Sequence, residues 1–120
     1  MNDDIEDDFP IVNRSALVLE PTVQFLAWLK RNPGDRFEMT LEDIQEDCSV
    51  YLLPDIQDQE EWLRKNYRSL FEQELFNWCM DDELWPQERS FKTFGEFFRP
   101  RFHTLVCDLG NGPIILEPEY

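Results

Sequence analysis

The sequence is poor in the residues on which most site chemistry depends. Its 120 residues include one His, four Gly and three Cys. A single His argues against the paired-histidine motifs of zinc sites, and no Cys-x-x-Cys spacing occurs. Phosphate-binding loops and dinucleotide fingerprints need several glycines close together, and only Gly110 and Gly112 are close. We therefore expect neither a metal nor a cofactor.

The chain also lacks long apolar stretches. No run approaches the roughly 20 residues that a membrane-spanning helix needs. The first eight residues are acidic, the reverse of the basic start of a signal peptide. Cys48, Cys79 and Cys107 are odd in number and are expected to be reduced thiols, buried as small apolar side chains. These features predict a cytoplasmic protein without membrane contact.

Basic residues are scarce as well. Asp and Glu number 26 against 11 Lys and Arg, which gives a net charge of −15. Residues 1–62 hold 16 acidic and 4 basic residues, whereas residues 63–120 hold 10 and 7. Such a surface repels phosphates, so we expect no direct nucleic-acid binding. Ten Phe, four Trp and three Tyr supply enough apolar area to exclude a disordered acidic chain.

The pattern predicts one globular domain over residues 11–120, preceded by an acidic disordered tail over residues 1–10. Apolar runs bounded by Pro or Gly predict strands, and 3.6-residue periodicity with capping residues predicts helices. The expected strands cover 15–20, 49–53, 102–109 and 114–116, and the expected helices cover 22–31, 40–47, 59–80 and 90–98. The predicted fold class is α+β, a small sheet of three to four strands with helices packed on one face.

One pair of residues has the chemistry of a nucleophile with its base. On the strand predicted over 102–109, His103 and Cys107 share a face but stand about 13 Å apart, too far to share a metal or a proton. Leu105 and Leu109 lie on the same face, which therefore reads as core. We expect no catalytic role for either residue.

An aromatic and basic segment stands out between two expected helices. Trp and Arg are frequent energetic anchors of protein interfaces, which makes Trp85 and Arg89, with Arg99 and Arg101, candidate partner-binding residues. Pro100 is expected to end a helix, so that Arg99 and Arg101 flank a turn. The alternative is structural: Trp85 covers the core between two helices, and Arg89 pairs with an acidic residue.

An acidic row forms the second candidate surface. Glu42, Asp43, Glu46 and Asp47 lie on the helix expected over 40–47. Acidic rows attract basic proteins over long distances and accelerate their encounter. With Glu38 the row also has the character of a phosphate mimic, which would occupy a DNA-binding protein.

Scattered residues resemble a family of small bacterial proteins of unassigned function. They are Asn13-Arg14-Ser15-Ala16, Phe25, Trp28, Leu29, Trp78-Cys79, Leu84-Trp85-Pro86 and the stretch from His103 to Leu109. The similarity spans most of the chain. It implies a bacterial cytoplasmic protein and brings no known activity or functional residue.

The leading hypothesis is a non-enzymatic cytoplasmic protein that binds a basic protein partner through its anionic surface. Two alternatives are a nucleic-acid-mimicking inhibitor of a DNA-binding protein and a small enzyme with carboxylate chemistry. The enzyme hypothesis requires a pocket that combines Asp or Glu with apolar walls. A homodimer that covers exposed aromatic residues and an acidic surface that serves solubility alone also remain open.

Overall fold

A three-stranded antiparallel sheet organises the molecule, in the strand order β2-β1-β3. The computed structural model describes residues 9–31, 38–46 and 48–117. The strands are β1 (Ser15–Pro21), β2 (Val50–Leu53) and β3 (Phe98–His103). The helices are α1 (Val23–Arg31), α2 (Leu41–Gln45), α3 (Gln59–Trp78) and α4 (Phe91–Phe97), with a 3-10 turn over Asp82–Leu84. The predicted α+β class, a small sheet with helices on one face, is confirmed.

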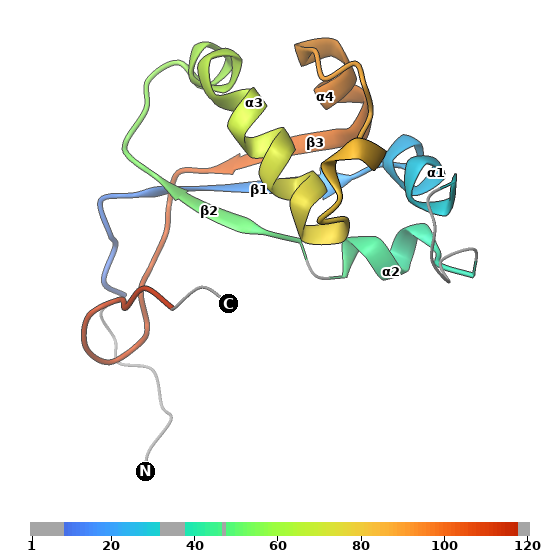
Figure 1. Ribbon diagram of the computed structural model, residues 1–120. Coiled ribbons are helices and arrows are strands. Elements are labelled where there is room, and N and C mark those ends of the chain that lie inside the picture. The colour runs from blue at the N-terminus through green and yellow to red at the C-terminus, as the bar shows by residue number, and fades with distance from the viewer. Residues whose placement is uncertain (1–8, 32–37, 47, 118–120) are drawn as a thin grey trace.

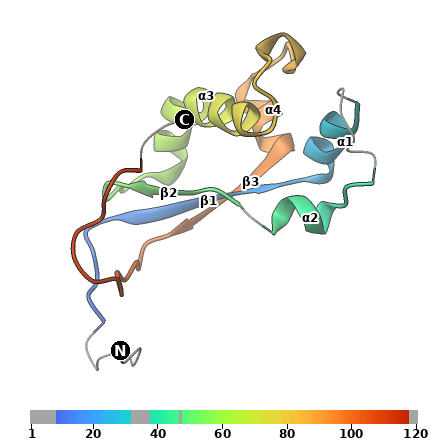
Figure 2. The same ribbon diagram turned by 60° about the horizontal axis from the view of Figure 1, so that its bottom comes forward.

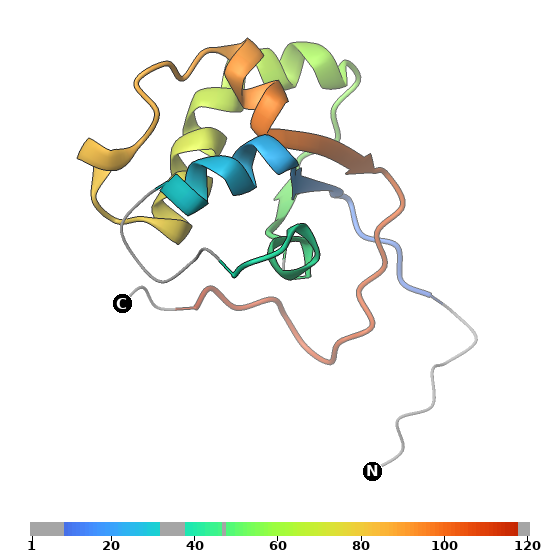
Figure 3. The same ribbon diagram turned by 90° about the vertical axis from the view of Figure 1, so that its right-hand side faces the viewer.

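The helices cover the sheet unequally. Figure 1 shows α3 and α4 on the same side of the three strands. Helices α1 and α2 lie together near the C-terminal end of β1 (Figure 3). Turning the molecule exposes the opposite face of the strands, which no helix covers along its length (Figure 2). The sheet therefore has an inner face against the core and an outer face.

Strand β1 is central because its apolar residues can be buried on both sides. Leu17 and Leu19 are fully buried on the inner face, and Ala16, which precedes them, is buried on the outer face. Pairing is in register with both neighbours, so that Leu17 stands opposite Tyr51 of β2 and Phe102 of β3. Alternation along each strand then decides which side chains reach the core.

The inner face is filled by aromatic rings. Phe25 of α1, Phe71 of α3 and Phe94 of α4 are fully buried, and Phe98 of β3 contacts all three. The ring centroids of Phe25 and Phe98 are 4.9 Å apart and those of Phe71 and Phe98 are 5.9 Å apart, within the usual range for aromatic pairs. The aromatic residues that excluded disorder thus form one core that joins three helices to β3.

Capping residues begin the helices where the sequence predicts. Thr40 and Asp43 form a reciprocal capping box at α2, and the side chains of Asp58 and Ser90 cap α3 and α4. Thr22, where the first helix was expected to begin, lies just before α1. Its hydroxyl donates to the carbonyls of Glu96 and Phe97, which ties the end of β1 to the end of α4.

The predicted strands at the C-terminal end are wrong. The third strand is Phe98–His103 instead of residues 102–109, and residues 114–116 are not in a strand. Pro100 lies inside β3, so Arg99 and Arg101 lie on a strand and do not flank a turn. An edge strand tolerates a proline when the side that lacks the N–H faces away from the neighbouring strand. The sequence pattern does not show which side that is.

The prediction that His103 and Cys107 lie on a strand face packed against the core is wrong as well. His103, Leu105, Cys107 and Leu109 are all exposed. After β3 the chain runs beside residues 10–12, joined by a hydrogen bond from the amide of Val12 to the carbonyl of Val106. This two-stranded contact lies beyond the sheet and has no helix to cover it (Figure 1).

None of the helices in the described ranges has the length and apolar composition that a membrane span requires. Helix α3 has 20 residues, but charged residues occur along its whole length.

Candidate functional site

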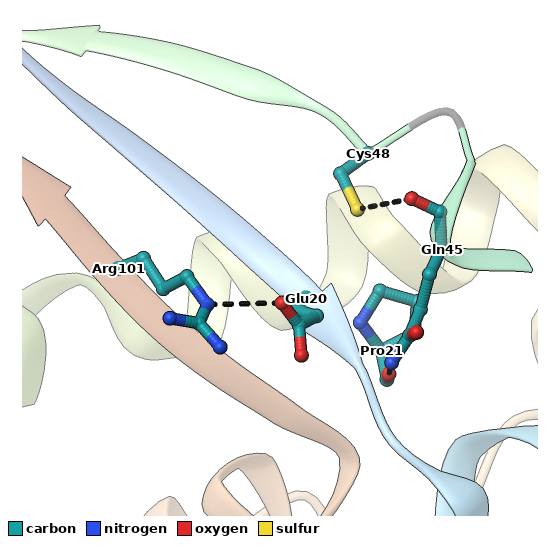
Figure 4. Close-up of polar contacts among 5 residues, drawn as sticks. All are labelled: Glu20, Pro21, Gln45, Cys48 and Arg101. Carbon is teal, nitrogen blue, oxygen red and sulfur yellow. Dashed lines mark hydrogen bonds and ion pairs between the residues drawn. The ribbon is translucent and has the colours of Figure 1, made fainter. Parts of the chain in front are cut away.

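The direction of the backbone groups of β1 fixes which strand edges are free. The side chain of Gln45 on α2 (Figure 4) donates to the carbonyl of Pro21 at 3.0 Å. On the opposite side of the strand, the amide of Thr22 donates to the carbonyl of Phe97 at 2.9 Å. Backbone groups alternate sides along a strand. The backbone N–H and C=O groups of the odd-numbered residues of β1 therefore point towards β2, and those of the even-numbered residues point towards β3.

Strand β2 consequently presents an open edge. Tyr51 and Leu53 stand opposite Leu17 and Ser15, whose backbone groups face β2, and so they form the hydrogen-bonded pairs. The N–H and C=O groups of Val50 and Leu52 then point away from the sheet. No backbone hydrogen bond to either residue occurs on that side within the described ranges. We call this free side of Val50–Leu53 the β2 edge.

The side chains of the β2 edge are apolar and exposed. Val50 and Leu52 are 63 % and 47 % exposed, and both lie on the outer face beside Val18 and Ala16 of β1. Exposed aliphatic residues on a bare edge strand are the usual template for pairing with another chain. The β2 edge therefore combines unpaired backbone groups with apolar contacts.

Acidic residues lie at both ends of the β2 edge. The predicted surface residues Glu42, Asp43 and Glu46 are exposed on and after α2, which precedes β2. The fourth predicted residue, Asp47, lies outside the described residues. Four further exposed acidic residues follow β2, namely Asp55, Asp58, Glu60 and Glu61. Glu60 and Glu61 form ion pairs with Arg64 and Lys65 and are partly neutralised.

Strand β3 differs from β2 at its free edge. Pro100 stands opposite Leu19, which faces β2, so the missing N–H of Pro100 lies on the free side of β3. Arg99, Arg101 and His103 are exposed on the outer face and alternate with the less exposed Phe98, Pro100 and Phe102. Arg101 Nε donates to Glu20 Oε2 at 2.9 Å (Figure 4). Two of the predicted partner-binding residues thus form a basic row beside an interrupted edge.

Trp85 and Arg89 lie together, apart from Arg99 and Arg101. The indole N–H of Trp85 donates to the carbonyl of Cys79 at 2.8 Å, and the Arg89 guanidinium lies 5.9 Å from the Trp85 ring. Arg89 also donates to the carbonyl of Pro86 and lies 4.0 Å from Glu72. Both side chains are half-buried. These contacts close the segment between α3 and α4, which favours the structural alternative over the partner-binding one.

A groove of about 510 Å³ lies at the junction of α1, α2 and β1, and Arg99 of β3 also lines it. Glu20, Glu96 and Arg99 contribute charged groups to its wall, and Gln24 and Gln45 contribute amides. All of these groups have access to solvent. Among the described residues that line the groove, none is a buried polar or charged residue.

A second cavity contains a buried carboxyl group. It has a volume of about 320 Å³ and lies between α2, α3 and the start of β2, with apolar walls from Leu19, Pro21, Ile44 and Trp78. Glu74 lines it and is only 4 % exposed. We call it the Glu74 pocket.

The carboxyl group of Glu74 is held by groups from β2 and the residues before it. The hydroxyl of Tyr51 donates to Glu74 Oε2, and Ser49 also hydrogen-bonds to this carboxyl group. Burial raises the pKa of Glu74, an effect that the bonds from Tyr51 and Ser49 oppose. Burial also raises the pKa of Tyr51, which the adjacent Glu74 raises further. Cys48 lines the pocket as well and donates to the carbonyl of Gln45 at 3.3 Å (Figure 4).

Glu74, Tyr51 and Ser49 were missed by the sequence analysis, although one signal was present. Glu74 lies four residues from Leu70 and from Trp78, on the apolar stripe of α3. A carboxyl group on such a stripe requires a buried partner. The partner, Tyr51, is 23 residues away in the sequence, and no local pattern indicates it.

The cysteine and metal predictions have separate outcomes. Cys48, Cys79 and Cys107 are free thiols, but Cys107 is exposed and the other two are half-buried, so the expected burial is wrong for Cys107. Within the described residues no group of three metal-ligating side chains is close enough to hold an ion.

Comparison of the chain with protein-family models, curated proteins and solved structures finds no match. The resemblance to small bacterial proteins stays a prediction. The function must therefore be argued from the β2 edge and the two cavities themselves.

Proposed function

We propose that this protein binds a partner protein by accepting an extended, basic segment of that partner as a fourth strand at the β2 edge. The observation that carries the proposal is the open side of Val50–Leu53, where unpaired backbone groups, exposed apolar side chains and flanking acidic residues coincide. Strand addition draws its affinity from main-chain hydrogen bonds and its specificity from alternate side chains.

The alternation of β2 defines what the partner segment must contain. On the outer face its side chains would meet Val50 and Leu52, so apolar residues are favoured at every second position. Beyond the four residues of β2, the segment would reach Glu46 at one end and Asp55 at the other. Lys or Arg at both ends of the segment would complement these carboxylates.

The net charge of −15 supports the same partner chemistry. Long-range attraction speeds the encounter with a basic segment, and it disfavours pairing of two copies of this acidic chain. A cytoplasmic location belongs to the proposal, and the three free thiols support it because reducing compartments maintain thiols.

The alternatives receive less support from the geometry. A phosphate mimic needs a long row of carboxylates, and α2 has five residues, about one and a half turns. An acid–base enzyme needs two titratable groups with separate roles, and Glu74 is the single carboxylate among the described residues that line its pocket.

A peptide titration tests the proposal. The probe is a short synthetic peptide with valine at alternate positions and lysines at both ends, here the lysine peptide. We expect calorimetric binding at low salt at least tenfold tighter than that of a control peptide with glutamate in place of lysine. A second control keeps the lysines but replaces two valines with proline, which prevents strand formation, and should bind at least tenfold more weakly.

The two controls separate strand addition from non-specific attraction. Equal binding of the lysine peptide and its proline-containing control would show that the acidic surface attracts basic peptides without using the β2 edge. No binding of either peptide would remove the support for a basic segment.

A further inference from the structure

The Glu74 pocket has the dimensions and walls of a site for a small molecule. Its volume of about 320 Å³ lies at the lower end of the usual range for ligand pockets. Leu19, Ile44 and Trp78 form apolar walls, and the exposed Asn77 lies at its rim. The pocket is partly open to solvent and is lined by both polar and apolar groups, so a ligand that fits it would combine a polar group with an apolar body.

The polar groups of the pocket accept hydrogen bonds and positive charge. Glu74 provides the only ionisable oxygen atoms among the lining residues of the described chain, and Tyr51 occupies one of its two oxygens. Trp78 adds an aromatic ring, whose face attracts cations. Among the described residues that line the pocket there is no Lys or Arg, so no positive charge there favours an anion.

We infer that the Glu74 pocket binds a small organic ammonium compound, with the ammonium group against Glu74 and its apolar body against Ile44, Leu19 and Trp78. A charge-assisted hydrogen bond between the ammonium group and a buried carboxylate is stronger than a neutral one. The negative charge of the whole chain favours the same class of ligand. This site is distinct from the β2 edge and does not depend on the proposed function.

Binding should be coupled to the release of a proton. Burial raises the pKa of Glu74, so the empty pocket holds the carboxyl group in its protonated form over a wider pH range than usual. An ammonium ligand binds the ionised form, so affinity should rise as the pH rises through the pKa of Glu74. It should fall again only when the ammonium group loses its own proton, near pH 10 for an alkylamine.

Few other groups interfere with this titration. Cys48 lines the pocket beside Ser49, and Tyr51 bonds directly to Glu74. The pKa of Tyr51 is raised, so its hydroxyl keeps its proton across the range in which Glu74 titrates. Helix α2 contributes Ile44 and β1 contributes Leu19 and Pro21, none of which is charged.

The test compares 2-phenylethylammonium with its neutral analogue 2-phenylethanol on the intact protein. We expect the ammonium compound to bind at least tenfold more tightly at pH 8. Calorimetry across buffers of different ionisation enthalpy should show proton release in the pH range where Glu74 titrates. A shift of the Trp78 indole resonance would locate the ligand. Equal affinity for the two compounds, or affinity that is independent of pH between 4 and 9, would overturn the proposal.

Variants sharpen the same test. Glu74→Gln keeps the shape and a hydrogen-bond acceptor for Tyr51 but removes the charge, and it should reduce the affinity for the ammonium compound at least tenfold. Glu72→Gln makes the same change on the same helix outside the pocket and should leave it within twofold. If Glu74→Gln fails to fold, the ammonium–alcohol comparison on the unaltered protein still decides the question.

Discussion

The two edges of the sheet differ in the groups that they offer to another chain. Strand β3 carries Pro100 on its free side and displays Arg99 and Arg101 on its outer face. Strand β2 keeps every N–H on its free side and displays Val50 and Leu52 between acidic residues. One edge is therefore interrupted and basic, and the other is open, apolar and flanked by negative charge.

This difference shows how a small sheet can restrict where it is extended. Natural edge strands commonly avoid pairing through prolines, charges or short length. Here the proline and the alternating basic residues lie on β3 alone, whereas β2 is protected only by its length of four residues. Under the proposed function a partner strand adds at β2, where the described residues of the free side carry no proline, and the acidic flanks favour a basic segment.

The largest expected effect separates the two faces of β2. Leu53→Ala removes a side chain that is buried in the core and should lower the free energy of unfolding by about 2–5 kcal/mol. The neighbouring change Leu52→Ala alters an exposed side chain and should cost about 0.5 kcal/mol or less. Urea denaturation followed by circular dichroism measures both. Similar losses for both variants would show that Leu52 is covered in solution.

A proline introduced into the β2 edge, as Pro100 is in β3, should weaken peptide binding. Leu52→Pro removes one N–H from the free side, as Pro100 does in β3, and should weaken binding of the lysine peptide at least tenfold. Leu52→Ala shortens the same side chain but keeps the N–H and should weaken binding less. Calorimetry gives both affinities, and retained binding by a folded Leu52→Pro variant would exclude the edge as the site.

Neutralising the acidic flanks should produce a smaller effect that depends on salt. The double variant Glu46→Gln with Asp55→Asn should weaken lysine-peptide binding about three- to tenfold at low ionic strength, because exposed charges act through screened attraction. The difference should nearly vanish at high salt. The matched control, Asp82→Asn with Glu83→Gln, changes the 3-10 turn and should leave affinity within twofold. Equal losses in the two variants would indicate an effect of net charge alone.

The smallest expected effect concerns the pH dependence of stability. The pKa of Glu74 is raised in the folded protein above its ordinary value of 4.5, so the folded state binds more protons than the unfolded state between these two values. Stability should therefore fall as the pH rises from about 4.5 through the folded pKa. Glu74→Gln should flatten this decline in urea denaturation series. An unchanged slope would show that Glu74 ionises freely in the fold.

Local patterns predicted the four helices and the first two strands because the decisive interactions there are local. Thr40 with Asp43, and Asp58 and Ser90, cap helices through contacts within three residues. Pro100 is the counterexample. It was expected to end a helix and to lie in a turn, yet it lies in β3. The strand tolerates it because the pairing with β1 places its missing N–H on the free side, and the local sequence does not show this pairing.

The candidate sites were less predictable because they depend on contacts between distant segments. The acidic residues of α2 could be read from the sequence, but the open edge beside them appears only once β2 is paired with β1. Glu74 and Tyr51 meet across α3 and β2, and the sequence offered only a misplaced carboxylate on an apolar stripe. Trp85 was a candidate partner-binding residue by residue type, whereas its hydrogen bond to the nearby Cys79 favours a structural role.

Amide hydrogen exchange at β2 tests the central claim most directly. In the protein alone, the amides of Val50 and Leu52 should exchange quickly, because they face solvent, whereas those of Tyr51 and Leu53 should be protected by β1. Saturation with the lysine peptide should slow exchange at Val50 and Leu52 at least tenfold and leave Arg99 and Arg101 unchanged. Protection of Val50 and Leu52 before the peptide is added, or no change afterwards, would contradict an open edge that accepts a partner strand.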